Sequence, residues 1–159
     1  MKRAKWSARG RGAATALLLI GAPGPTLRAQ PPAQPPGVQN PQRAWQNWTL
    51  NCQGCHRPDG SGSAGTTPSV AGTVSRFLSV ERGREYLVRV PGVATSPLTD
   101  AELSEVLNWM LWRFDPGHLP ADFPAFSAAE VGQLRKHPLR LEASQMRSEL
   151  LAKADAGER

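Results

Sequence analysis

Two cysteines and a histidine stand close together in the segment Cys52-Gln53-Gly54-Cys55-His56. This C-x-x-C-H pattern is the attachment signature of a c-type haem, in which two thiols add to the haem vinyl groups. Cysteines three residues apart on one turn can reach both vinyl edges, and the next side chain then points along the haem normal. A neutral imidazole would supply the proximal iron ligand. The pattern therefore predicts one covalent haem c, held by Cys52 and Cys55 with His56 on the iron.

Three other functions of a C-x-x-C pair compete with this interpretation. A redox dithiol is normally housed in a βαβ unit, and nothing near the motif resembles one. A Cys₄ zinc site needs a second cysteine pair, but the chain has only 2 cysteines. A disulfide across two intervening residues would be strained. We therefore favour haem attachment.

The first 29 residues have the pattern of a secretory signal peptide. Five basic residues precede the apolar run 13–22, and Leu27-Arg28-Ala29 offers a small residue for cleavage after Ala29. The apolar run is too short to span a bilayer as a helix, so a retained membrane anchor is the weaker alternative. We expect export to the periplasm, with no transmembrane segment after cleavage.

The positive charge of the chain lies mostly in this signal. The sequence has 19 Lys and Arg against 13 Asp and Glu, and 6 of the basic residues but none of the acids precede residue 30. The mature chain is therefore formally neutral. A neutral chain argues against a nucleic-acid partner.

Proline content and helix signals divide the rest of the chain. Residues 30–41 are rich in proline and predict an extended, disordered linker. Asn40-Pro41 predicts a helix start that carries Trp45 and Trp48, both expected in the core, toward Cys52. Thr99 and Glu102 form a capping-box pattern that opens an apolar helix ending at Pro116-Gly117. We assign 42–115 to a haem domain and 116–159 to a helical extension.

The run from His56 through Gly60, Gly62 and Gly65 to Pro68-Ser69-Val70-Ala71-Gly72 resembles the class I cytochromes c. The resemblance covers about residues 42–115. It implies an all-α cytochrome c fold in which the first and last helices cross around the haem, with Trp109 near the crossing. It also implies that the Pro68 carbonyl accepts a hydrogen bond from His56. Arginines 76, 84 and 89 are candidates for the haem propionates, or are solvated surface charges.

The sixth iron ligand does not follow the class I pattern. Members of that family usually carry a methionine, often as Met-Pro, before the last helix, and this chain has Val90-Pro91 there. Residues 91–98 contain no methionine, histidine or lysine. Met110 is our candidate, although a methionine on an apolar helix face is usually a core residue. Met146, His118, His137 or an open position are the alternatives, and both histidines are expected to be exposed.

The extension contains two further helix patterns. Ser127 and Glu130 form a second capping-box pattern, and Ala143, Met146, Leu150 and Ala154 make the apolar stripe of a later helix. These helices either pack on their own domain or dock a partner.

Together these observations predict a periplasmic one-electron carrier between a dehydrogenase and a later acceptor, both of them redox proteins. A pentacoordinate haem protein that binds a gas or peroxide is one alternative. A cytochrome subunit anchored in a larger dehydrogenase complex is another. The residues contain no catalytic carboxylate pair or nucleophile–base set, so we expect no enzymatic substrate chemistry.

Overall fold

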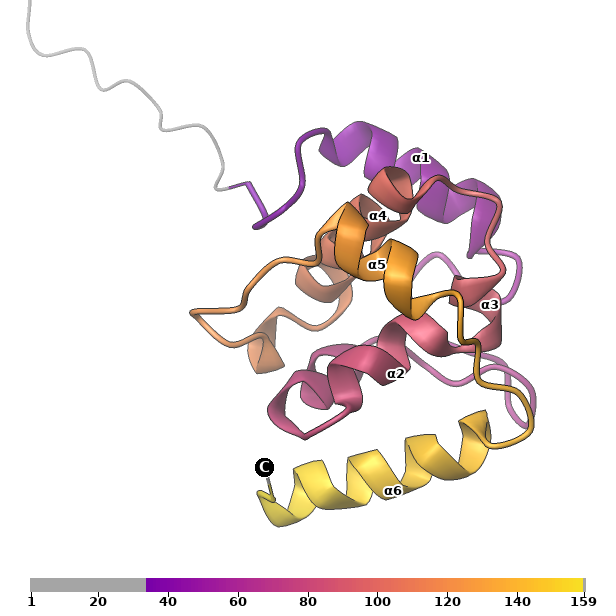
Figure 1. The fold of residues 1–159 in the computed structure, drawn as a ribbon, viewed down its shortest axis with the longest axis vertical. Helices are drawn as coiled ribbons and strands as arrows, with labels where there is room; N and C mark the ends of the chain where they lie inside the picture. The colour runs from indigo at the N-terminus through magenta and orange to yellow at the C-terminus, as the bar shows by residue number, and fades with distance from the viewer. Residues whose placement is uncertain (1–33, 159) are drawn as a thin grey trace, which may run out of the picture. The chain divides into compact units, whose positions relative to one another are not determined.

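The computed structural model describes residues 34–158, which belong to one compact unit. The predicted signal peptide and cleavage site and the first residues of the linker lie outside the described residues. Residues 34–158 form helices and no strand, so the predicted all-α class is confirmed (Figure 1). No helix in this range is long and apolar enough to cross a membrane. The elements are α1 Pro41–Asn51, η1 Val74–Ser79, α2 Gly83–Arg89, α3 Pro91–Ala94, α4 Asp100–Phe114, η2 Pro116–His118, α5 Ala128–Leu134 and α6 Ala143–Ala156.

Helix α1 begins where the sequence predicts. The Asn40 side chain accepts a hydrogen bond from the Arg43 amide at 3.0 Å, and Pro41 occupies the first turn. The buried stripe consists of Ala44 and Trp48, which are four residues apart. The expectation that Trp45 is also a core residue is wrong, since its exposed fraction is 47%. One residue turns a helix by about 100°, which moves Trp45 off the stripe that faces α4.

Helix α4 forms the centre of the core. Its predicted capping box is confirmed, because Thr99 and Glu102 bond each other's backbone amides. The helix packs across α1, and the Trp48 ring packs against both Trp109 and Phe114, with centroids 6.1 Å and 4.8 Å away. Crossing the first and last helices of the haem domain places the end of α1, and therefore the cysteine motif, against the core.

The described end of the proline-rich linker is packed, which contradicts the expectation of a disordered spacer. Val38 is buried, and the amides of Gln39 and Asn40 both donate to the Glu105 carboxylate, at 2.9 and 2.7 Å. Asn108 also donates to the Gly37 carbonyl at 3.4 Å. The buried polar groups of α4 need partners, and residues 37–40 supply them.

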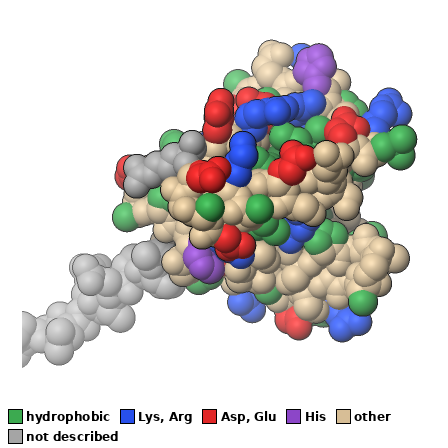
Figure 2. Space-filling model, turned by 90° about the horizontal axis from the view of Figure 1, so that it is seen from below, with side chains coloured by type: hydrophobic (Ala, Val, Ile, Leu, Met, Phe, Trp, Pro, Cys, Tyr) green, Lys and Arg blue, Asp and Glu red, His purple; other side chains and the backbone are tan. Residues whose placement is uncertain are grey.

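The extension packs against the haem domain. Helix α5 contacts α4 and α2, and α6 runs alongside α2 and η1 (Figure 1). Five extension residues are buried with the main core: Phe123, Phe126, Val131, Leu139 and Leu150. On the side of α6, acidic and basic side chains are interspersed over the surface (Figure 2).

The second capping box of the sequence analysis is only half formed. The Ser127 side chain accepts from the Glu130 amide at 3.2 Å, as predicted. The Glu130 carboxylate instead receives two hydrogen bonds from the Arg84 guanidinium. A bidentate pair with arginine is stronger than a single bond to a backbone amide, so the carboxylate turns toward α2.

Candidate haem site

The C-x-x-C-H segment forms a tight turn directly after α1. The Cys52 amide continues the helix by donating to the Trp48 carbonyl at 2.8 Å. The Cys52 carbonyl then accepts from the amides of Cys55 and His56 at 3.1 and 2.9 Å. These bonds bring both thiols and the imidazole to one end of α1. The two cysteines do not form a disulfide with each other, and Cys52 is half-buried while Cys55 is exposed.

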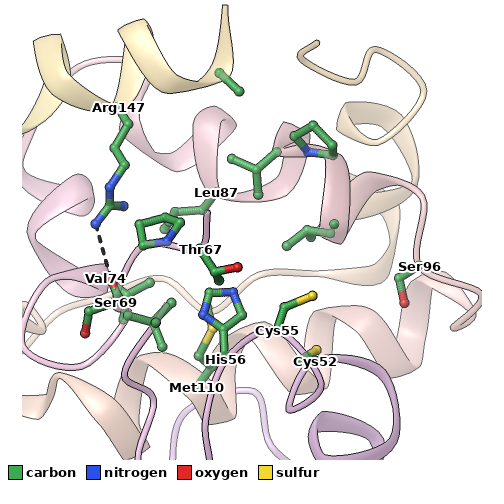
Figure 3. A pocket seen from close by; sticks show the side chains of 18 of the residues that line it. Cys52, Cys55, His56, Thr67, Ser69, Val74, Leu87, Ser96, Met110 and Arg147 are labelled. Atoms are coloured by element: carbon green, nitrogen blue, oxygen red, sulfur yellow. Dashed lines mark hydrogen bonds between the residues drawn. The ribbon is translucent and has the colours of Figure 1, made fainter. Parts of the chain in front are cut away.

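This turn lines a cavity of about 920 Å³. Cys52, Cys55 and His56 form part of its wall, while α4 contributes apolar residues that include Leu107 and Met110. The segment from α2 to α3 adds Leu87, Val90, Pro91 and Val93, and α6 adds Ala143, Ser144 and Arg147. Ligand pockets in proteins usually occupy about 300–1,000 Å³ and are largely apolar. The cavity therefore has the size and lining of a site for a large apolar cofactor (Figure 3).

The loop after His56 is folded on itself by short hydrogen bonds. The Gly60 amide donates to the Arg57 carbonyl at 2.8 Å, and the Val70 amide donates to the Gly60 carbonyl at 2.9 Å. Gly60 has a φ of 79°, which favours glycine, and its Cα lies against the Phe114 ring. This packing brings Pro68 back toward His56.

The electrostatics of the site suit an iron ligand. Burial is the main cause that lowers the pKa of His56, with a further contribution from the nearby Arg147 charge, while the Pro68 carbonyl opposes the shift. The neutral imidazole is the form that binds a metal. Burial, and secondarily Cys55, raises the pKa of Cys52 to about 11. At neutral pH Cys52 is therefore a protonated thiol in the haem-free chain.

Two buried polar atoms at this wall make no hydrogen bond, Nδ1 of His56 and Nε1 of Trp48. The Pro68 carbonyl is close enough to act on the His56 ring, but the contact falls outside hydrogen-bond geometry. The free thiols, the neutral imidazole and the apolar lining fit a haem bonded through Cys52 and Cys55 with His56 on the iron. Within residues 34–158, no three His, Cys, Asp or Glu side chains cluster as a metal-binding group.

The candidates for the sixth ligand lie in different places. Met110 is buried and lines the cavity from α4. Met146 is half-buried on α6 and is not among the lining residues. His118 and His137 are exposed, as expected. Met110 is therefore the one candidate of the four that the structure brings to the cavity among the described residues.

The arginines considered for the haem propionates contact the extension instead. Arg84 binds Glu130, Arg76 pairs with Asp155, and Arg89 donates to the His137 carbonyl at 2.7 Å. None of the three lines the cavity. Arg147, which the sequence analysis did not single out, does line it. Arg147 follows Ala143 and Ser144 by four and three residues, so the three share one face of α6. Nothing in the sequence, however, shows which face of that helix meets the haem domain.

A small all-α domain with a C-x-x-C-H turn, a glycine-rich loop and crossed helices around a large apolar cavity defines a c-type cytochrome domain. Known proteins agree with this class. The chain is 34% identical over 106 residues to cytochrome c-552 of Thermus thermophilus, covering 55% of this chain and 81% of the relative. A cytochrome c-552 from a strain of the same species gives the same identity, with 72% of the relative covered. No protein-family model matches the sequence.

The chain belongs to the class I-like monohaem c-type cytochromes. Its cofactor is one covalently bound haem c, and the family consists of electron carriers. The haem c inferred from the C-x-x-C-H motif and the all-α fold implied by the class I resemblance are thereby confirmed.

Proposed function

We propose that this cytochrome is exported to the periplasm and carries single electrons from a dehydrogenase to a later acceptor. The observation that carries the proposal is the convergence of two free thiols and a neutral imidazole on one wall of an apolar cavity. The interspersed surface charge and the neutral mature chain are compatible with transient redox partners. The proposal rests also on the signal-peptide pattern of residues 1–29.

Each residue of the site has a distinct task in this proposal. Cys52 and Cys55 hold the haem permanently, and His56 supplies the proximal nitrogen. In the haem-bound protein Pro68 is expected to orient the His56 ring by accepting a hydrogen bond from Nδ1, a buried atom without another partner, and this bond would also set the basicity of the ring. The bound haem supplies a one-electron iron couple. The apolar residues of α4 and α2 keep water away from the site, which limits solvent reorganisation.

Electron exchange is proposed at the side of the site where the cysteines lie. Cys55 is exposed, and so are its neighbours Asn51 and Gly54. Helix α6 and the 57–72 loop cover other parts of the cavity. A redox partner that approaches this edge therefore meets the least intervening protein.

The test is to produce the full-length chain in a host with working haem-attachment machinery. The mature protein is expected to begin at Gln30, to be heavier than its polypeptide by one haem and to show a low-spin c-type spectrum. Cys52→Ala together with Cys55→Ala should abolish covalent attachment. A colourless wild-type protein of bare-polypeptide mass would overturn the haem site, retention of residues 1–29 would overturn the cleavage, and recovery of the protein in the cytoplasmic fraction would overturn the export step.

A second candidate is a haem with an open sixth position that binds a small gas or peroxide. The observation that favours it is the aliphatic wall formed by Leu87, Val90 and Val93, in the region where class I members place their methionine. Carbon monoxide added to the reduced protein distinguishes the two candidates. An immediate spectral change shows an open iron, while an unchanged spectrum together with a methionine-to-ferric charge-transfer band shows the six-coordinate carrier.

A further inference from the structure

The charge inside the cavity is carried by a single residue of the extension. Among the described residues that line the cavity, Arg147 alone is an Arg, Lys, Asp or Glu. It reaches down from α6 to the loop after His56, where its Nη2 donates to the Ser69 carbonyl at 3.1 Å (Figure 3). The α6 helix belongs to the extension, which lies beyond the residues that resemble the class I family.

The surroundings of Arg147 leave most of its hydrogen-bonding capacity unused. Its guanidinium carbon lies 5.2 Å from the centre of the Phe77 ring, and the buried Tyr86 hydroxyl is close to it. A guanidinium carries five donors, and the Ser69 carbonyl accepts from one nitrogen. No carboxylate within residues 34–158 forms a salt bridge with it, whereas Arg76, Arg84 and Arg89 each pair with an acid.

A haem brings two propionate carboxylates into this cavity. A carboxylate removed from water is strongly destabilised unless a charged or hydrogen-bonding partner compensates. Guanidinium matches a carboxylate with two parallel hydrogen bonds, which makes arginine the preferred partner in partly buried sites. Arg147 is the cation available for that purpose in the lining described above.

We propose that Arg147 binds a haem propionate and thereby fastens α6 over the cavity. This inference rests on the proposed haem site. The proposed contact gives α6 a function. Leu150 is the one buried residue that the described part of α6 contributes to the core. The propionate contact adds a second attachment point, so the closed position of α6 depends in part on the cofactor.

The first test uses the wild-type holoprotein and needs no variant. Nuclear Overhauser effects are measured in the reduced protein between the Arg147 guanidinium protons and the propionate methylene protons, under carbon monoxide if the iron is high-spin. Cross-peaks between the two groups are the expected result. Their absence, with the guanidinium protons assigned, would overturn the proposal while leaving the haem site intact.

The second test measures the reduction potential of variants by spectroelectrochemical titration. Arg147→Gln removes a positive charge beside the haem and should lower the equilibrium constant for reduction by a fixed mediator about tenfold. Arg147→Lys keeps the charge and should recover most of this loss. Lys153→Gln is the matched control, because it removes an exposed cation from the same helix away from the cavity lining.

A structural role for Arg147 alone is distinguished by Leu150→Ala, which loosens α6 without changing its charge. Proteolysis between α5 and α6 should become faster in Leu150→Ala and in Arg147→Gln. The lowered reduction potential, however, should appear in Arg147→Gln, and mutations that stabilise the packing of α6 should not restore it. Equal potentials for Arg147→Gln and Lys153→Gln would contradict the proposal. Absence of covalent haem in the wild-type protein would instead contradict the function proposed above.

Discussion

At the scale of single residues, the convergence of the two cysteines and the histidine on one cavity was predictable because it depends on spacing within five residues. Cys52, Cys55 and His56 need only one turn to come together, and local sequence determines that turn. Pro68 was inferred from a resemblance and not from the residues themselves. Arg147 could not be predicted, because its approach to the cavity depends on how a distant helix packs.

The glycine-rich loop gives a prediction about Gly62. A Cβ at this position would overlap the Thr67 carbonyl oxygen, and the Ser63 and Thr67 backbones are already bonded to each other at 2.8 and 3.0 Å. Gly62→Ala should therefore destabilise the holoprotein by about 2 kcal/mol, the range for an overpacked site. Denaturant unfolding measures this change.

Gly117→Ala is the control for that experiment. A Cβ on Gly117 meets no atom within 4 Å and Gly117 does not line the cavity, so the added methyl needs no displacement of its neighbours. If Gly62→Ala proved as stable as Gly117→Ala, the loop would be looser than the structure shows. The position of Pro68 beside His56 would then lose its support.

Met110 is the residue whose substitution separates ligation from packing. It is buried in α4 and lines the cavity. Met110→Leu conserves most of the volume, so the free energy of unfolding should change by less than about 1.5 kcal/mol if the side chain only fills the core. If Met110 is an iron ligand, Met110→Leu should instead abolish the methionine-to-ferric charge-transfer band. The ferric absorption spectrum of Met110→Leu, recorded beside wild type, decides between the two roles.

At the scale of elements, helices with strong local signals were predictable and their contacts were not. The Thr99–Glu102 capping box and the Pro116-Gly117 stop predicted both ends of α4 closely. The sequence analysis assigned no helix to residues 91–94, where Pro91 begins α3. The contacts of Arg76, Arg84 and Arg89 with the extension were missed, because the partners lie far along the chain, 46 residues away for Arg84 and Glu130. No periodic pattern encodes such a distance.

Arg84 should be the main polar attachment of α5. Its guanidinium binds the Glu130 carboxylate, donates to the Pro124 carbonyl at 2.7 Å and lies 3.9 Å from the centre of the Phe126 ring. Arg84→Met keeps the apolar stem but loses these contacts, and should cost about 1.5 kcal/mol. Thermal unfolding of the holoprotein measures the loss.

The exposed Arg140 provides the comparison for Arg84. Arg140→Met removes an equal charge from the extension and should leave the midpoint of unfolding nearly unchanged. A double variant of Arg84→Met with Glu130→Gln should be little worse than Arg84→Met alone, because both changes remove the same interaction. Fully additive losses would show that Arg84 and Glu130 act separately.

At the scale of the whole molecule, the fold is built around a space that the polypeptide does not fill. The cavity of about 920 Å³ is bordered by residues from α1, α2, α3, α4 and α6. Small domains bury little surface on folding, so a covalent cofactor contributes a large part of the core. The sequence indicated this dependence through its motif, but it did not show that the extension takes part in enclosing the cavity.

Removing the cofactor should therefore abolish cooperative folding. The variant with Cys52→Ala and Cys55→Ala, purified without haem, should lose its near-ultraviolet circular dichroism and unfold without a sharp transition. Secondary structure is expected to persist in part, since the capping signals of α4 are local. A haem-free chain with a sharp thermal transition like that of the holoprotein would show that the helices hold each other without the cofactor.

The position of α6 over the cavity bears on when the cofactor can enter. Residues of α6 line one side of the cavity, so that side has no cover until α6 has packed. A bulky porphyrin reaches the thiols at residues 52–56 most easily in a chain at that stage of folding. Attachment of the haem is therefore expected to precede the docking of α6, so that loading and closure are separate steps.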